Sequence, residues 1–230
     1  MEYEQLIGLD LGTNYTTVSI FKDKKILTLQ DCTNPTNAYS LKIPTCISYT
    51  SRGILIGYEA QMNYNNNPTS TVFFLKMYIG QDYETCKTMN KELGGNFEIV
   101  SICGSPIIRM NVDGVIFDRT PSELYTDFMK VLIEKIEVKY ECRINYIVLT
   151  VPVDHEQNRQ YAAIAAAANI HTQGSMKSIT GPPENSQVFL LSRCCELFRM
   201  NASFLPELLV STIAASYPRP EQKGHCRKGS

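Results

Sequence analysis

Apolar and polar residues alternate near the amino terminus in the short stretches that are typical of β-strands. Residues 6–9 and 15–20 are rich in β-branched, aromatic and aliphatic side chains, and the Gly-Thr-Asn sequence at 12–14 separates them with turn residues. A third stretch of this kind covers residues 25–30. The pattern predicts a hairpin followed by a third antiparallel strand, which together open an α/β lobe.

Two further strands and a helix are predicted in the next part of the chain. Residues 43–49 predict a strand at a sheet edge, because Pro44 has no N–H to donate to a neighbouring strand. Residues 54–57 predict another strand, and a helix should continue from Tyr58. Residues 81–119 then predict a small α+β insertion, in which a polar segment precedes three strands near 97–102, 106–112 and 115–117. Asp113-Gly114 is a strong hairpin signal between the last two strands.

The best local helix signal is the sequence Thr-Pro-Ser-Glu at 120–123. Thr is an N-cap residue, Pro suits the first turn, and Glu completes a capping box. An apolar residue recurs every four positions from Leu124 to Ile136, so this face of the helix is predicted to pack in the core. Residues 144–151 are almost continuously apolar and predict a buried parallel strand, with an Ala-rich helix after it at about 156–169.

Composition excludes several classes of protein. The chain has 230 residues and a formal net charge of −1, which argues against a nucleic-acid or anionic-membrane surface. The amino terminus lacks the pattern of a secretory leader, and no apolar run is long enough to span a membrane. We therefore expect a cytoplasmic or nuclear protein. The eight cysteines form no Cys-x-x-Cys pair, which favours reduced structural thiols over a zinc site.

Two motifs carry candidate chemistry, and one of them fails. His155-Glu156 resembles the start of a zinc-protease motif, but Arg159 stands where the second His is needed. The turn at 12–14 is more promising, because Gly12 admits close backbone approach and the turn amides could face phosphate oxygens. Asp10 is placed to hold Mg²⁺ through its water shell. The plain alternative is an ordinary hairpin with a Gly turn and an Asp cap.

Several stretches resemble the 70-kDa heat-shock chaperones, which belong to the actin-like ATPase superfamily. Asp-Leu-Gly-Thr-Asn at 10–14 is similar to the family's Asp-Leu-Gly-Thr-Thr, with Asn14 in place of a hydroxyl residue. The stretch 67–73 is similar to Asn-Pro-x-Asn-Thr-Val-Phe, and 76–80 to Lys-Arg-Leu-Ile-Gly, with Met77 in place of Arg. The stretch 147–152 is similar to Ala-Val-Ile-Thr-Val-Pro. The resemblance runs from residue 5 to about 170.

This resemblance implies a fold, a ligand and roles for named residues. Residues 1–170 would form lobe I of an actin-like, ribonuclease H-like α/β fold, with an insertion subdomain at about 40–119. The ligand would be ATP or ADP with Mg²⁺. Lys76 would orient the γ-phosphate and the attacking water, and Pro152 and Arg159 would relay between nucleotide and a distant domain. The implied nucleotide contacts are Asp10, which also holds Mg²⁺ through water, and Gly12, Thr13, Asn14 and Tyr15.

The resemblance stops where residues 171–230 begin. The family's Asn-Glu-Pro-Thr helix, whose Glu lies near the attacking water, and its second phosphate loop, Asp-Leu-Gly-Gly-Gly-Thr, do not occur in this sequence. We expect residues 171–230 to be an unrelated, partly disordered tail with at most helices around 186–200 and 204–215. The expected molecule is a truncated form that hydrolyses ATP negligibly by itself.

Three functions are compatible with these residues. The first is an ATP-binding chaperone of the 70-kDa heat-shock family, involved in protein folding and stress response, with co-chaperones and unfolded proteins as partners. The second is a non-catalytic binding module that docks on chaperone partners. The third is another actin-superfamily member such as a sugar kinase, which the match at 67–80 and 145–152 disfavours.

Overall fold

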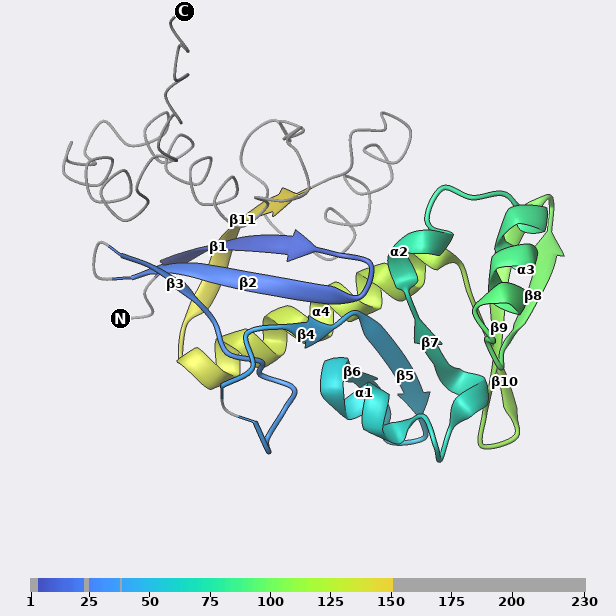
Figure 1. The fold of residues 1–230 in the computed structure, drawn as a ribbon, viewed down its shortest axis with the longest axis horizontal. Helices are drawn as coiled ribbons and strands as arrows, with labels where there is room; N and C mark the ends of the chain where they lie inside the picture. The colour runs from blue at the N-terminus through green and yellow to red at the C-terminus, as the bar shows by residue number, and fades with distance from the viewer. Residues whose placement is uncertain (1–3, 23–24, 38, 151–230) are drawn as a thin grey trace, which may run out of the picture. The chain divides into compact units, whose positions relative to one another are not determined.

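The computed structural model describes residues 4–22, 25–37 and 39–150, and these residues form three β-sheets and the helices that connect and cover them (Figure 1). The first sheet has five strands, in the order β11-β1-β2-β3, with β4 pairing β2 beyond the end of β3. Its strands are β1 (Glu4–Leu11), β2 (Tyr15–Lys22), β3 (Lys25–Thr28), β4 (Ile43–Pro44) and β11 (Arg143–Thr150). The opening antiparallel strands and the parallel β1–β11 pair confirm the predicted α/β lobe.

The β1–β2 hairpin separates an apolar face from a polar one. Leu9 pairs with Val18, and Ile7 pairs with Ile20, so these side chains share one face and are buried. Asp10 pairs with Thr17 and Gly8 with Ser19, which places Asp10 on the other face. The period of two along each strand therefore fixes the side on which Asp10 is presented.

The second sheet begins where the predicted strand at 43–49 is interrupted. The structure divides that stretch into β4 and β5 (Cys46–Thr50), which belong to different sheets. Pro44 cannot donate a hydrogen bond, and the next N–H, that of Thr45, donates to the carbonyl oxygen of Asn14 at 2.9 Å. The prediction of one continuous strand was therefore wrong at Thr45. The sheet continues with β6 (Gly53–Ile56) and β7 (Thr71–Phe73), and the connections contain α1 (Gly57–Asn63) and η1 (Pro68–Ser70).

The third sheet and its helix form the predicted insertion. Strands β8 (Glu98–Ile102), β9 (Ser105–Val112) and β10 (Val115–Arg119) form an antiparallel meander, as the turn signals predicted. Helix α3 (Tyr83–Glu92) packs on β8 and β9, although the sequence indicated only a polar segment there. Asp82 caps this helix by accepting a hydrogen bond from the Thr85 N–H at 2.8 Å. The sequence did not predict α3 because the helix buries few apolar side chains and its apolar periodicity is weak. Its Asp82 cap was the local signal for a helix start.

Helix α4 (Pro121–Tyr140) packs against strands of all three sheets. Thr120 and Glu123 form the predicted capping box, and Leu124, Phe128, Leu132 and Ile136 are all buried. In Figure 1 the helix passes beneath the β1–β2 hairpin toward the short helix α2 (Leu75–Tyr78), which it contacts. The core of the described residues is therefore centred on α4.

Some sequence predictions fall outside the described residues. Pro152, Arg159, the Ala-rich helix at 156–169 and the tail at 171–230 all lie there. Cys32, Cys46, Cys86 and Cys103 are free thiols. None of the described helices has the length and apolar character of a membrane span.

Candidate functional site

The tight turn between β1 and β2 forms the centre of the candidate site. The Gly12 N–H donates to the Tyr15 carbonyl oxygen at 3.1 Å, which closes the turn. A Cβ atom at position 12 would clash with that same oxygen, so only glycine fits. Asn14 is exposed at the tip and Thr13 is half-buried. The turn is thus compact, and its outer surface is accessible to a ligand.

Lys76 reaches this turn from α2, 65 residues further along the chain than Leu11. Its Nζ donates to the carbonyl oxygen of Leu11 at 2.9 Å. Burial lowers the pKa of Lys76 from its ordinary value, and the negative charge of Asp10 partly offsets that effect. The structure therefore brings together three of the predicted residues: Asp10, Gly12 and Lys76.

The position of Lys76 is fixed by the anchoring of a very short helix. Leu75 and Tyr78 are 1% and 2% exposed, and the Tyr78 ring packs edge-on against Phe97 with centroids 5.9 Å apart. Phe74 precedes the helix in the left-handed conformation, with φ of 55°, which costs about 1–2 kcal/mol for a residue other than glycine. The left-handed conformation of Phe74 changes the direction of the chain between β7 and α2.

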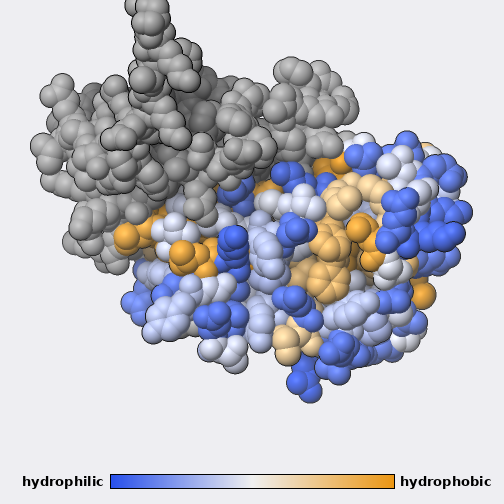
Figure 2. All heavy atoms as spheres, in the orientation of Figure 1, coloured by the Kyte–Doolittle hydropathy of each residue, from blue (hydrophilic) through white to orange (hydrophobic). Residues whose placement is uncertain are grey.

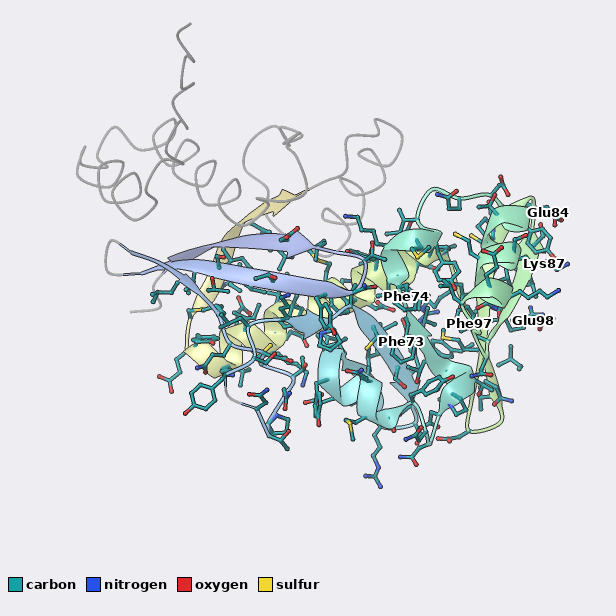
Figure 3. The ribbon with its side chains drawn as sticks, in the orientation of Figure 1. Phe73, Phe74, Glu84, Lys87, Phe97 and Glu98 are labelled. Carbon is teal, nitrogen blue, oxygen red and sulfur yellow. The ribbon has the colours of Figure 1, made fainter. Side chains whose placement is uncertain are left out.

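Aromatic rings support the bend at Phe74. Phe73 contacts Tyr64 edge-on at 5.3 Å and lies 6.2 Å from the ring of Phe74. Figure 3 labels both phenylalanines at the junction of β7 and α2, and Figure 2 shows apolar atoms gathered over this region among hydrophilic residues. The rings hold the segment that carries Lys76 against the second sheet.

Residues 42–45, here called the strap, pack against the other side of the turn. The sequence did not predict this contact. Tyr15 pairs with Pro44, and the hydroxyl oxygens of Thr16 and Thr45 are hydrogen-bonded at 2.9 Å in a buried position. Lys42 lies just before this segment's paired residues, with its Nζ 5.8 Å from the centre of the Tyr15 ring. The Pro44 interruption signalled a break in pairing, but no local pattern indicates which strand the segment would join.

The polar groups of the site are of the kinds that bind magnesium and phosphate. Asp10 supplies a hard carboxylate oxygen, and the described residues contain no cluster of three or more His, Cys, Asp or Glu that could enclose an ion. A magnesium ion that keeps its waters and is shared with phosphates needs only one or two protein carboxylates. The turn and Lys76 add peptide groups and a positive charge at the same place.

The fold of the described residues is that of the nucleotide-binding lobe of an actin-like α/β protein. Comparison with known families makes this more specific, because residues 6–175 match the family model described as Hsp70 protein. The chain belongs to the Hsp70 family.

Curated relatives agree with this assignment. The chain is 29% identical over 157 residues to the heat shock 70 kDa protein of Trichophyton rubrum, covering 68% of this chain and 23% of the relative. It is 26% identical over 172 residues to the chaperone protein HscA homolog of Vibrio vulnificus, covering 74% and 26%. It is 25% identical over 166 residues to a ribosome-associated molecular chaperone of Nakaseomyces delphensis, covering 72% and 26%. The chain thus spans about a quarter of the length of these relatives.

Proposed function

We propose that this lobe binds the phosphates of ATP or ADP with Mg²⁺ and serves a chaperone function of the Hsp70 type. The observation that carries the proposal is the 2.9 Å contact between Lys76 Nζ and the Leu11 carbonyl oxygen, which sets an ammonium group beside the turn and Asp10. Phosphate binding needs positive charge and backbone donors that are already in place. Asp10 holds the magnesium ion through water, and residues 12–15 contact the phosphate oxygens.

We also propose that the 230 residues alone hydrolyse ATP negligibly. The family's second phosphate loop and the Glu beside the attacking water do not occur in the sequence. Loss of a single preorganised electrostatic contact typically lowers the rate about a hundredfold or more. Lys76 would orient a phosphate, but the sequence has no counterpart of the family motif whose Glu lies near the attacking water. Phosphate release at saturating Mg-ATP should therefore stay at the rate of a buffer blank.

Calorimetric titration with Mg-ATP tests the binding proposal. Asp10→Ala and Lys76→Ala should each lower the affinity about tenfold or more, because each removes a charge-assisted contact. Lys87→Ala is the matched control, since Lys87 lies on α3, which packs on the third sheet. Unchanged affinity in both site variants would contradict the proposal. No binding by the parent chain, with its circular dichroism and melting transition intact, would favour the non-catalytic module.

The remaining family functions are proposals of the same kind. Pro152 and Arg159 would relay nucleotide state to another domain, co-chaperones and unfolded proteins would be the partners, and the cytoplasm would be the compartment. Support comes from the names of the relatives, which include a heat shock 70 kDa protein and a ribosome-associated molecular chaperone. Phosphoryl transfer stimulated by a sugar would instead favour the sugar-kinase alternative.

A further inference from the structure

We propose that Lys42 is a second phosphate-facing cation of this site, in addition to Lys76. This inference rests on the proposed nucleotide function and extends it to a residue outside the phosphate-loop motif. Three observations support it: the strap that fixes residue 42 beside the turn, the face of the sheet on which it lies, and its charge environment.

The strap holds the backbone next to Lys42 firmly against the turn. The Thr45 N–H donates to Asn14 at 2.9 Å, and β4 pairs with β2 through Tyr15 and Thr16. On the other side of Lys42, the Ser40 hydroxyl donates to the Lys42 carbonyl oxygen at 3.0 Å. The backbone that carries Lys42 is therefore fixed beside the turn. A ligand that contacts the tip of the turn lies within reach of the Lys42 side chain.

Strand pairing places Lys42 on the face that carries Asp10. Asp10 pairs with Thr17, and Tyr15 lies two residues before Thr17, so Asp10 and Tyr15 project from the same face. Tyr15 pairs in turn with Pro44, while Ile43 pairs with Thr16 on the opposite face, which carries Leu9 and Val18. Lys42 therefore belongs with Pro44 and Tyr15, in agreement with its Nζ lying over the Tyr15 ring at 5.8 Å.

The charge environment leaves the Lys42 ammonium available for a ligand. It forms no ion pair with any carboxylate in the part of the chain that the structure describes, whereas Lys135 is paired with Glu59 at 2.9 Å. Tyr15 is 52% exposed, and its ring positions the amine without neutralising it. A polyphosphate carries several negative charges, and Asp10 adds one more. A second lysine would thus balance charge that Lys76 alone leaves uncompensated.

Mg-ATP and AMP titrations of Lys42→Ala, Lys42→Glu and Lys42→Arg test the proposal. Lys42→Ala should weaken Mg-ATP binding about three- to tenfold, Lys42→Glu should weaken it further, and Lys42→Arg should retain it. The loss should shrink for AMP, which has a single phosphate, and at high salt, which screens an exposed charge. Lys87→Ala is the matched control, because Lys87 Nζ lies over the Tyr83 ring at 5.4 Å in a similar geometry on α3 (Figure 3).

The outcomes separate this inference from the proposed function. Affinity that falls in Lys76→Ala but is unchanged in a folded Lys42→Ala would overturn the role of Lys42 and leave the nucleotide site standing. Equal losses for Mg-ATP and AMP would also overturn it, because a charge that faces the phosphate chain must distinguish the two ligands. A parent chain that binds no Mg-ATP would overturn both proposals.

Discussion

Asp31 is a carboxylate held almost entirely out of water, with 1% of its surface exposed. Its Oδ1 accepts hydrogen bonds from the Thr33 N–H at 2.7 Å and from the Thr33 hydroxyl at 2.6 Å. The pKa of Asp31 is nonetheless raised, because desolvation outweighs these hydrogen bonds and the charge of Lys139. The ionised form therefore opposes folding at neutral pH.

The sign of this shift gives a pH-dependent prediction. The pKa of Asp31 is higher in the folded protein than its ordinary value of 3.8, so protonated Asp31 contributes stability that is fully present below pH 3.8. This stability is lost as the pH rises through the folded pKa. Asp31→Asn keeps an oxygen acceptor for Thr33 and carries no charge. Its melting temperature relative to the parent should therefore be higher at pH 7 than at pH 3.5, as measured by circular dichroism.

Asp82→Asn is the matched control because its shift has the opposite sign. The Thr85 N–H holds the pKa of the exposed Asp82 below its usual value, so its contribution is present at neutral pH and is lost in acid. The melting temperature of Asp82→Asn relative to the parent should therefore be lower at pH 7 than at pH 3.5. A difference between parent and Asp31→Asn that does not change with pH would contradict the account of Asp31.

Gly57 is the position where the first helix meets the strap. It has φ of +61°, and a Cβ there would clash with Thr33 Oγ1 and lie 2.9 Å from Ile43 Cγ2. Thr33 is buried and accepts from the Tyr58 N–H at 2.8 Å, and Ile43 belongs to β4. The start of α1 thus depends on a residue without a side chain.

Gly57→Ala should therefore be strongly destabilising. The left-handed backbone costs about 1–2 kcal/mol, and the forced displacement of Thr33 and Ile43 adds about 1–3 kcal/mol. Gly94→Ala is the control, since Gly94 has φ of +69° and open space around its missing Cβ. In urea unfolding, Gly94→Ala should lower the free energy of unfolding only by the backbone cost of about 1–2 kcal/mol. Equal losses in the two variants would show that packing against the strap has no energetic role.

The elements that sequence predicted correctly are those whose signals are local. The Thr120 capping box and the buried stripe from Leu124 to Ile136 specify α4 without reference to the rest of the chain. The Asp113-Gly114 turn specifies the β9–β10 hairpin in the same way. The break at Thr45 was missed because it depends on pairing with Asn14, which lies far earlier in the chain.

The candidate site shows the same division between local and long-range information. The motif at 10–14 could be found by sequence because its residues are adjacent and its spacing is distinctive. Lys76 was placed there by family resemblance, and the structure brings its Nζ to the end of β1. Lys42 was not found, because only the pairing of β4 with β2 brings it over Tyr15.

At the scale of the whole molecule, the described residues would supply one wall of the proposed nucleotide site. Helix α4 packs against strands of all three sheets and contacts α2, so the turn and Lys76 rest on one continuous core. The chain covers 23% of the heat shock 70 kDa relative in Trichophyton rubrum. Whether this wall holds a triphosphate is therefore the question on which the functional account depends.

Lysine footprinting with and without Mg-ATP addresses that question most directly. The chain would be acylated with an N-hydroxysuccinimide ester at concentrations where titration shows bound nucleotide, and each lysine would be quantified by mass spectrometry of its peptide. Mg-ATP should slow the acylation of Lys76 severalfold and leave the acylation of Lys87 unchanged. Acylation of Lys76 at the same rate in the bound and free states would contradict the claim that this amine and the β1–β2 turn face one triphosphate.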